Sequence, residues 1–184
     1  MKRFGMVLLA VALSVAAARP VMAQGTWRYG FSAGVLMPMS DYNTLDKTGF
    51  VGGAGATYWL AGSPLGIRGD FSYSQSSHDA TSGFDGHTKI MGGMASLVYA
   101  LNPASAPARI LLNGGLGYYN VKFDDATLGS SSESKVGFGI GAAVAFKMGT
   151  GSTRLIVGTR YTSVSTSGSP TAFLPITVGL SFGK

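Results

Sequence analysis

The segment of residues 135–147 reads KVGFGIGAAVAFK, and it decides the fold. Large apolar residues alternate with small ones, so that Val136, Phe138 and Ile140 fall on the same side of an extended strand. The other side is mostly glycine and alanine. A soluble sheet would usually carry polar side chains there, whereas small residues suit the narrow interior of a small closed barrel. The segment therefore predicts a strand of a transmembrane β-barrel whose large apolar side chains face lipid.

Seven further segments of about ten residues repeat this alternation, separated by breaks rich in glycine and serine. With 135–148, the predicted strands are 27–37, 50–60, 65–75, 88–101, 109–121, 154–164 and 173–182. The register of 88–101 stays open, because two sets of apolar residues compete for its outward face. They are Met91, Ala95, Leu97 and Tyr99 against Ile90, Met94 and Val98. The sequence predicts an all-β, eight-stranded, antiparallel up-and-down transmembrane β-barrel.

The connections between the predicted strands alternate in length. Short ones follow every second strand, at 61–64, 102–107 and 149–152, and generally longer polar ones occupy 38–49, 75–87, 122–134 and 165–170. Short periplasmic turns and long surface loops are expected of an outer-membrane barrel. Aromatic residues near the strand ends favour the same reading, because they form two interfacial bands. Trp27, Tyr58, Tyr99 and Phe182 make one band, and Tyr73, Tyr118 and Tyr161 the other.

The first residues have the features of a secretion signal. Lys2 and Arg3 precede an apolar run, 6–18, which is too short to span a bilayer as a helix. Val21-Met22-Ala23 offers small residues at the positions that a signal peptidase reads. We expect residues 1–23 to direct export through the Sec pathway and residues 24–184 to form the outer-membrane barrel domain. The alternative is that the run is a short membrane anchor.

The composition and charge of the chain favour some classes of protein and argue against others. The chain has no cysteine, so an exported domain of this size needs another source of stability, which a closed barrel with every backbone group paired provides. The formal charge is +6, and removal of the three basic residues of the signal lowers it to +3. The basic residues are spaced singly along strands rather than clustered, which argues against a nucleic-acid partner.

The final strand, FLPITVGLSF at 173–182, ends its apolar alternation in an aromatic residue. In this, and in its eight-strand plan, the chain resembles the outer-membrane barrel family of the OmpX and OmpA transmembrane-domain type. The resemblance implies that Gly179, Leu180 and Phe182 form the signal read by the barrel-assembly machinery. Two departures are the residues after Phe182 and the presence of Pro175, which lacks a ladder donor and predicts a bulge or weak pairing.

Catalysis has few candidate residues. The glycines of 52–55 and 137–141 lie inside alternating strands with no helix after them, so they do not form a phosphate-binding loop. The histidines and nearby acids of the second long loop are His78, His87, Asp79 and Asp85. Some small outer-membrane barrels are lipid A deacylases or acyltransferases. The resemblance of 160–163 to a deacylase strand puts Thr162 where the histidine would stand. We assign no catalytic residue, cofactor or metal, and keep a lipid A-modifying enzyme as the alternative.

Charged residues predict a polar interior. Strand parity directs eight of them into the lumen: Arg28, Arg68, Asp70, Lys89, Lys135, Lys147, Arg154 and Arg160. Eight strands enclose little more than their own side chains, so we expect a filled core with a polar network of Arg28, Arg68, Asp70, Arg154 and Arg160. Asp70 is the lone acid of the set and should meet Arg68, Arg160 or both. The alternative is an anion pathway or narrow pore.

A second basic set lies near the outer mouth, at Lys89, Lys122 and Lys135. Lysine binds phosphate as a point charge, so these residues are candidate contacts for lipopolysaccharide; the alternative is that they are solvated strand ends. We expect a monomeric structural or surface-interaction protein without catalysis. Its partners would be outer-membrane lipid, lipopolysaccharide, the assembly machinery and an extracellular partner bound by the loops.

Overall fold

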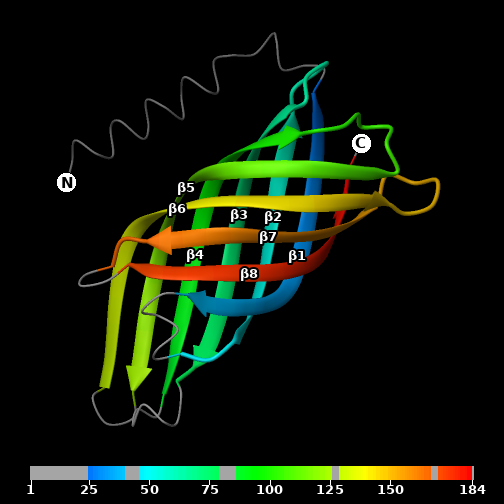
Figure 1. Ribbon diagram of the computed structural model, residues 1–184. Coiled ribbons are helices and arrows are strands. Elements are labelled where there is room, and N and C mark those ends of the chain that lie inside the picture. Colours follow the sequence, from blue (N-terminus) through cyan, green and yellow to red (C-terminus); the bar gives the residue numbers. More distant parts are fainter. Residues whose placement is uncertain (1–24, 40–45, 79–85, 126–128, 167–169, 184) are drawn as a thin grey trace, which may run out of the picture.

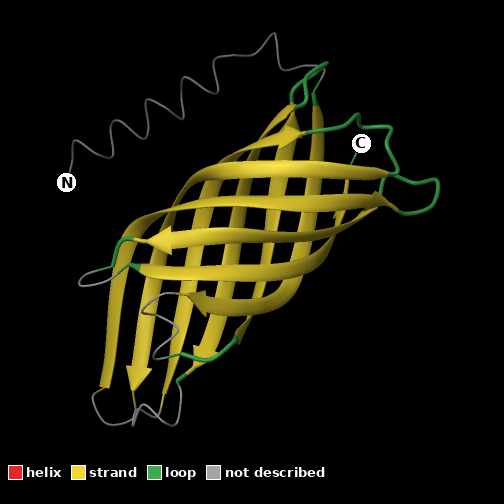
Figure 2. Ribbon diagram, viewed as in Figure 1, coloured by secondary structure: helices red, strands yellow, loops and turns green. Residues whose placement is uncertain are grey.

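The computed structural model describes residues 25–39, 46–78, 86–125, 129–166 and 170–183, which form a closed barrel of eight antiparallel strands (Figures 1 and 2). The strands are β1 (Thr26–Met39), β2 (Gly49–Trp59), β3 (Leu65–Ser77), β4 (Gly86–Ala100), β5 (Ala108–Asp125), β6 (Gly129–Lys147), β7 (Arg154–Val164) and β8 (Thr171–Phe182). Each strand pairs with the next, and β8 closes on β1. No helix in these ranges is long and apolar enough to cross a membrane. The predicted signal, 1–23, lies outside the described residues.

The two ends of the barrel differ in their connections. The short turns after β2, β4 and β6 gather at one end together with the end of β8, at the upper right of Figure 1. We call this the turn end, and the opposite end the loop end. The eight predicted strands are all present, but the loop predicted between β5 and β6 is mostly ladder, which continues to the pair Asp125 and Gly129. Asn120 of β5 supports this extension by donating to the hydroxyls of Ser132 and Ser134.

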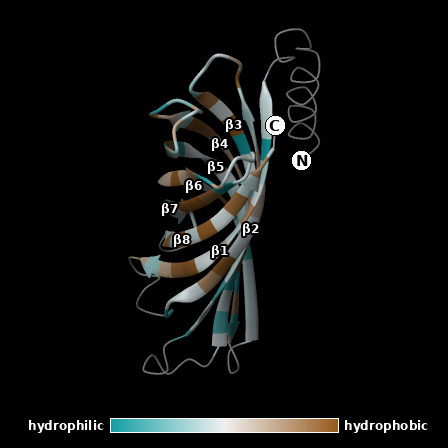
Figure 3. Ribbon diagram, turned by 90° about the vertical axis from the view of Figure 1, so that its right-hand side faces the viewer, coloured by the Kyte–Doolittle hydropathy of each residue, from teal (hydrophilic) through white to brown (hydrophobic). Residues whose placement is uncertain are grey.

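The side chains alternate across the barrel wall as predicted, and Figure 3 shows apolar and paler residues alternating along β1, β7 and β8. Outward-facing Phe31, Leu116 and Ile140 are 57%, 66% and 60% exposed. The open register of β4 is settled by burial and pairing: Leu97 faces outward, whereas Val98 is buried inside. An apolar outward face and a mixed interior are what a barrel in lipid requires.

Pro175 interrupts the β7–β8 ladder without shifting its register. Thr159 pairs with Ile176 and Thr162 pairs with Phe173, but the two positions between them have no ladder partners. The sums of the paired residue numbers are equal on both sides of the gap, so no residue is inserted and there is no bulge. Proline has no backbone N–H to donate, which accounts for the weak pairing that the sequence predicts.

Two apolar layers fill the lumen. The loop-end plug consists of Leu36, Val51, Ile90, Tyr119, Val121, Val164 and Phe173, with Phe123 packed against it. The turn-end layer consists of Trp59, Val98, Ala100, Leu111 and Ala145, with Ala143 and Ile156 packed against it. Every member of the plug except Phe123 is at most 8% exposed. The loop end of the lumen is therefore packed shut.

The Tyr119 side chain is the largest fully buried group of the plug. Its ring lies among three inward-facing glycines: Gly92 and Gly137 of the two neighbouring strands and Gly117 of its own strand. A Cβ at Gly92 would collide with the ring, and one at Gly117 would lie 2.7 Å from it. The ring also makes an edge contact with Phe173, with 6.3 Å between centroids. The small residues on the inner side thus make room for one large aromatic.

Candidate functional site

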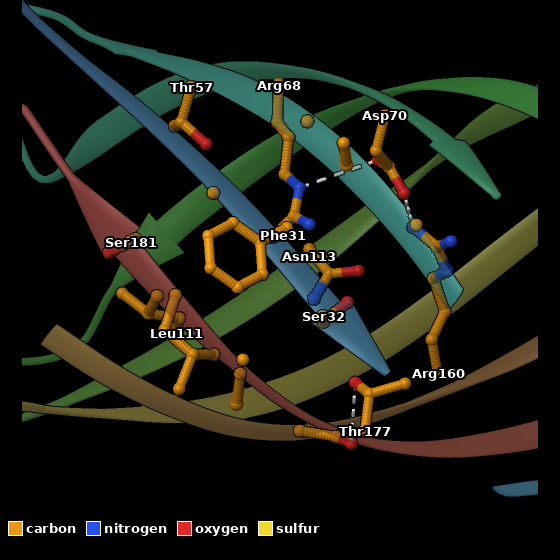
Figure 4. Close-up of a pocket in the computed structure, with 18 of the residues that line it drawn as sticks. Phe31, Ser32, Thr57, Arg68, Asp70, Leu111, Asn113, Arg160, Thr177 and Ser181 are labelled. Atoms are coloured by element: carbon orange, nitrogen blue, oxygen red, sulfur yellow. Dashed lines mark hydrogen bonds and ion pairs between the residues drawn. The ribbon is translucent and has the colours of Figure 1, made fainter. Parts of the chain in front are cut away.

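An ion-pair network lies midway along the lumen. Arg160 of β7 donates to Asp70 of β3 with 2.7 Å between Nη1 and Oδ1, and the Nε of Arg68 lies 3.5 Å from Oδ2 (Figure 4). The Asp70 side chain is 7% exposed, so its charge is largely removed from water. Two guanidinium groups compensate it there. The structure thus brings together three members of the predicted polar network.

The other two members, Arg28 and Arg154, lie apart from Asp70 at the turn end. Arg28 donates to the carbonyl of Ser152 and to Ser181, and Arg154 donates to the carbonyls of Ala104, Ala106 and Ala145. These bonds hold the β4–β5 and β6–β7 turns against the barrel.

Arg109 is a lumen residue that is not among those predicted from the sequence. Its guanidinium lies over the Trp59 ring, 3.9 Å from the centroid, inside the turn end. Its parity on β5 is that of Leu111, which is buried in the turn-end layer. Strand parity alone would therefore have placed Arg109 in the lumen beside Arg28 and Arg154.

A cavity of about 250 Å³ extends inside the lumen from the turn end, past the middle, to the plug. Arg28, Arg109 and Arg154 line it at the turn end, and Asp70 lines its middle. Towards the loop end it reaches the plug residues Val51, Ile90, Tyr119 and Phe173, but its lining does not include Leu36, Val121 or Val164. The cavity stops at the plug, so it is a cup rather than a channel.

The prediction that Lys89 points into the lumen is wrong. Lys89 is the ladder partner of Lys122, and both have the outward parity of Met91 and Tyr118. The error follows from the open register of β4, which the sequence did not fix. The two lysines therefore lie side by side on the outer face near the loop end.

The two lysines share one carboxylate. Asp124 Oδ1 lies 2.9 Å from Lys122 Nζ, and Oδ2 lies 3.2 Å from Lys89 Nζ and 3.4 Å from His87 Nε2. All these side chains are partly exposed. Two permanent positive charges and one negative charge leave this patch, which we call the lysine pair, with an excess positive charge.

Lys135 does not join the lysine pair. It is the ladder partner of Tyr119, so it lies on the inward side of β6, and its Nζ is 2.9 Å from Glu133 Oε1. Lys147 has the same inward parity but lies exposed at the turn end. The three lysines grouped by the sequence analysis therefore divide between the two faces of the wall.

A buried polar cluster at the loop end was not anticipated. Asp46 forms an isolated backbone bridge with His78, and its carboxylate accepts hydrogen bonds from Ser76 (2.8 Å) and Thr88 (2.9 Å). His78 Nε2 lies 3.3 Å from Thr88 Oγ1 and 4.0 Å from Asp46 Oδ2. Asp79 and Asp85, the acids that the sequence placed near His78, lie outside the described residues. No sequence signal connects Asp46 with His78, because separate connections carry them.

This cluster is not arranged as a catalytic triad. In a triad the histidine links the acid to the nucleophilic hydroxyl. Here the acid itself accepts the hydrogen bonds of both hydroxyls. Ser76 and Thr88 are at most 1% exposed, and His78 Nδ1 has no hydrogen-bond partner. Burial raises the pKa of Asp46, opposed by the two hydroxyl donors and His78. The cluster fastens the chain before β2 to β3 and β4.

The assembly-signal residues lie in the closing strand. Gly179 faces inward, where a Cβ would collide with the Phe31 carbonyl of β1, and Leu180 and Phe182 face outward. The Phe182 ring contacts Phe31 with 6.3 Å between centroids. Recognition of these residues by the assembly machinery stays a prediction.

Residues 6–182 match the model of a protein family described as the outer membrane protein beta-barrel domain. The chain belongs to this family. The family confirms the resemblance drawn from the sequence and makes the chain an outer-membrane barrel. Its apolar outward face therefore meets lipid, and its turn end, with the short connections, is periplasmic.

Solved structures share the fold at low sequence identity. Neisserial surface protein A is 17% identical, with a TM-score of 0.62, over 85% of this chain and 96% of that one. The attachment invasion locus protein Ail of Yersinia pestis is 18% identical (TM-score 0.53; 86% and 97% covered), and the outer membrane enzyme PagL is 13% identical (0.52; 84% and 98%). No curated protein matches the chain.

Proposed function

We propose that this protein is a non-catalytic surface barrel whose outer end binds phosphate groups of lipopolysaccharide through Lys89 and Lys122. The observation that carries the proposal is their position side by side on the lipid-facing side of β4 and β5, near the loop end. Phosphates of the outer leaflet's glycolipid lie near this height of a barrel.

The charge of the lysine pair supports this assignment. Asp124 compensates one lysine charge and leaves the other available for an anion. An ammonium group binds phosphate oxygen as a point charge, and such exposed contacts weaken as salt rises. Ail has been solved with the heparin analogue sucrose octasulfate, which shows an anionic ligand on a barrel of the same fold.

Retention of lipopolysaccharide tests the proposal. The double variant Lys89→Gln/Lys122→Gln should co-purify with less lipopolysaccharide than wild type, with an affinity about tenfold weaker, because two charge-assisted contacts are lost. Lys147→Gln is the matched control, since it also removes positive charge but at the periplasmic end. Lipopolysaccharide stripped of phosphate should bind wild type and the double variant equally.

Unchanged retention by the double variant would contradict the proposal. Equal loss in Lys147→Gln would also contradict it, because the effect would then follow net charge rather than position. Binding of sucrose octasulfate without binding of lipopolysaccharide would point to an extracellular sulfated sugar instead.

The absence of catalysis is part of the proposal, and the Asp46–His78 cluster supports it within the described residues. Its hydroxyls are buried and bonded to the acid, so neither is poised to attack an ester. Incubation of the purified protein with lipid A should release no fatty acid. Release that disappears in His78→Ala would establish the enzyme alternative.

A further inference from the structure

Three guanidinium groups converge at the periplasmic end of the lumen from strands on different sides of the barrel. Arg28 comes from β1, Arg109 from β5 and Arg154 from β7, and all three line the same cavity. Arg154 is close enough to repel both of the others electrostatically, and Arg28 repels Arg109. Such an arrangement is unfavourable unless something compensates it.

Within the part of the chain that the structure describes, no acidic side chain is placed to compensate these arginines. Asp70 already accepts a hydrogen bond from Arg160 and forms an ion pair with Arg68. Of the other seven acids, the four that the structure describes lie at the loop end: Asp46, Asp124, Asp125 and Glu133. Asp41, Asp79 and Asp85 lie outside the described residues. The cavity is therefore lined by five arginines and one aspartate, an excess of four positive charges.

The hydrogen bonding of the Arg109 guanidinium group is incomplete. Arg28 and Arg154 donate to turn carbonyls, whereas the buried Nε of Arg109 has no partner. The Trp59 ring holds the flat face of the Arg109 guanidinium and leaves its N–H edge to be satisfied by another group. An anion with several oxygens would provide both the missing acceptor and the missing charge.

We propose that the periplasmic mouth of the lumen binds an oxyanion, a phosphate or carboxylate group, between Arg28, Arg109 and Arg154. Guanidinium groups match both chemistries because their paired N–H donors fit paired oxygens. Beyond the arginines the cavity is walled by Trp59, Leu111 and Ile156 of the turn-end layer. The anion is therefore either free or the head of an amphiphile whose alkyl chain enters this apolar part.

The test compares anions at equal ionic strength. Thermal unfolding of the folded protein in an uncharged detergent would be followed in phosphate and in chloride. Phosphate should raise the midpoint of wild type, because a ligand that binds only the folded state stabilises it. Acetate and octanoate distinguish the two sources: a larger effect of octanoate assigns an amphiphile, and equal effects assign a free anion.

Arg109→Met is the decisive variant, because Arg109 makes no turn-holding hydrogen bond. Its phosphate affinity should fall about tenfold with loss of one charge-assisted contact, while Lys147→Met, an exposed lysine at the same end, should keep wild-type affinity. Equal wild-type midpoints in phosphate and chloride would overturn the proposal, as would equal losses in both variants. If Arg109→Met does not fold, the phosphorus-31 NMR signal of inorganic phosphate is measured with wild type instead. Binding should broaden the signal, and a signal that does not broaden would overturn the site.

Discussion

The loop-end and periplasmic halves of the lumen are filled by different means. The loop-end half is closed by apolar side chains, with Tyr119 set among glycines and Asp46 fully hydrogen-bonded beyond it. The rest of the lumen, from its middle to the periplasmic end, contains the cavity and five arginines, of which two are paired with Asp70. The difference shows that the barrel is solid towards the cell surface and is a charged cup towards the periplasm.

The largest effect should come from the carboxylate that joins the arginines of the cup. Asp70→Ala should lower the free energy of unfolding by about 3–5 kcal/mol, because it leaves two guanidinium groups without their buried partner. Urea unfolding in detergent would measure this loss. Asp70→Asn keeps the size and removes the charge, so it should lose nearly as much. A wild-type midpoint for both would mean that the network contributes no stability.

An arginine on the outer wall should be almost as costly, since nothing there can pair with it. Ile140→Arg should destabilise the barrel in a bilayer by about 2–4 kcal/mol. Ile140→Leu and an arginine at the exposed turn residue Thr150 are the controls, and both should be nearly neutral. If Ile140→Arg is also neutral, the residue does not face lipid.

A single added methyl group tests how tightly the plug is packed. Gly92→Ala puts a Cβ into the Tyr119 ring and should cost about 1–3 kcal/mol through overpacking. Gly93→Ala adds the same atom one residue along, on the outward side, where the nearest atom is 3.7 Å away. Equal unfolding midpoints for these two variants would mean that the ring moves aside without cost.

The smallest effect concerns pH at the loop end. Because the pKa of Asp46 is raised above its ordinary value of 3.8, the folded state holds this proton more tightly than the unfolded state. The resulting stability is present at low pH and is lost as pH rises from 3.8 through the raised pKa. As pH rises over that range, the unfolding midpoint of wild type should therefore fall relative to that of Asp46→Asn, which has no carboxyl group at this position. A difference that does not change with pH would contradict it.

The sequence predicts the wall of this barrel better than its contents. Alternation along 135–147 correctly places Ile140 outward, because lipid accepts only one kind of side chain there. It failed at Lys89, where both faces of β4 carry apolar residues and parity has no unique solution. The Asp46–His78 bridge was beyond reach, because contacts between two long connections leave no periodic pattern.

The lumen position of Arg109 could have been predicted from the sequence. Its parity with Leu111 puts it inside, and none of the acidic residues that the structure describes lies at the periplasmic end beside it. The extended β5–β6 hairpin was not predictable in the same way, because polar strands above the membrane carry no apolar alternation.

Closure of the lumen at the plug is the central claim of this account. Conductance across planar lipid bilayers tests it most directly, with Tyr119→Ala as a plug-opened variant that also reports insertion. We expect no discrete steps from wild type and small steps from Tyr119→Ala. Steps from wild type as large as those from the variant would contradict the closed lumen and establish a pore.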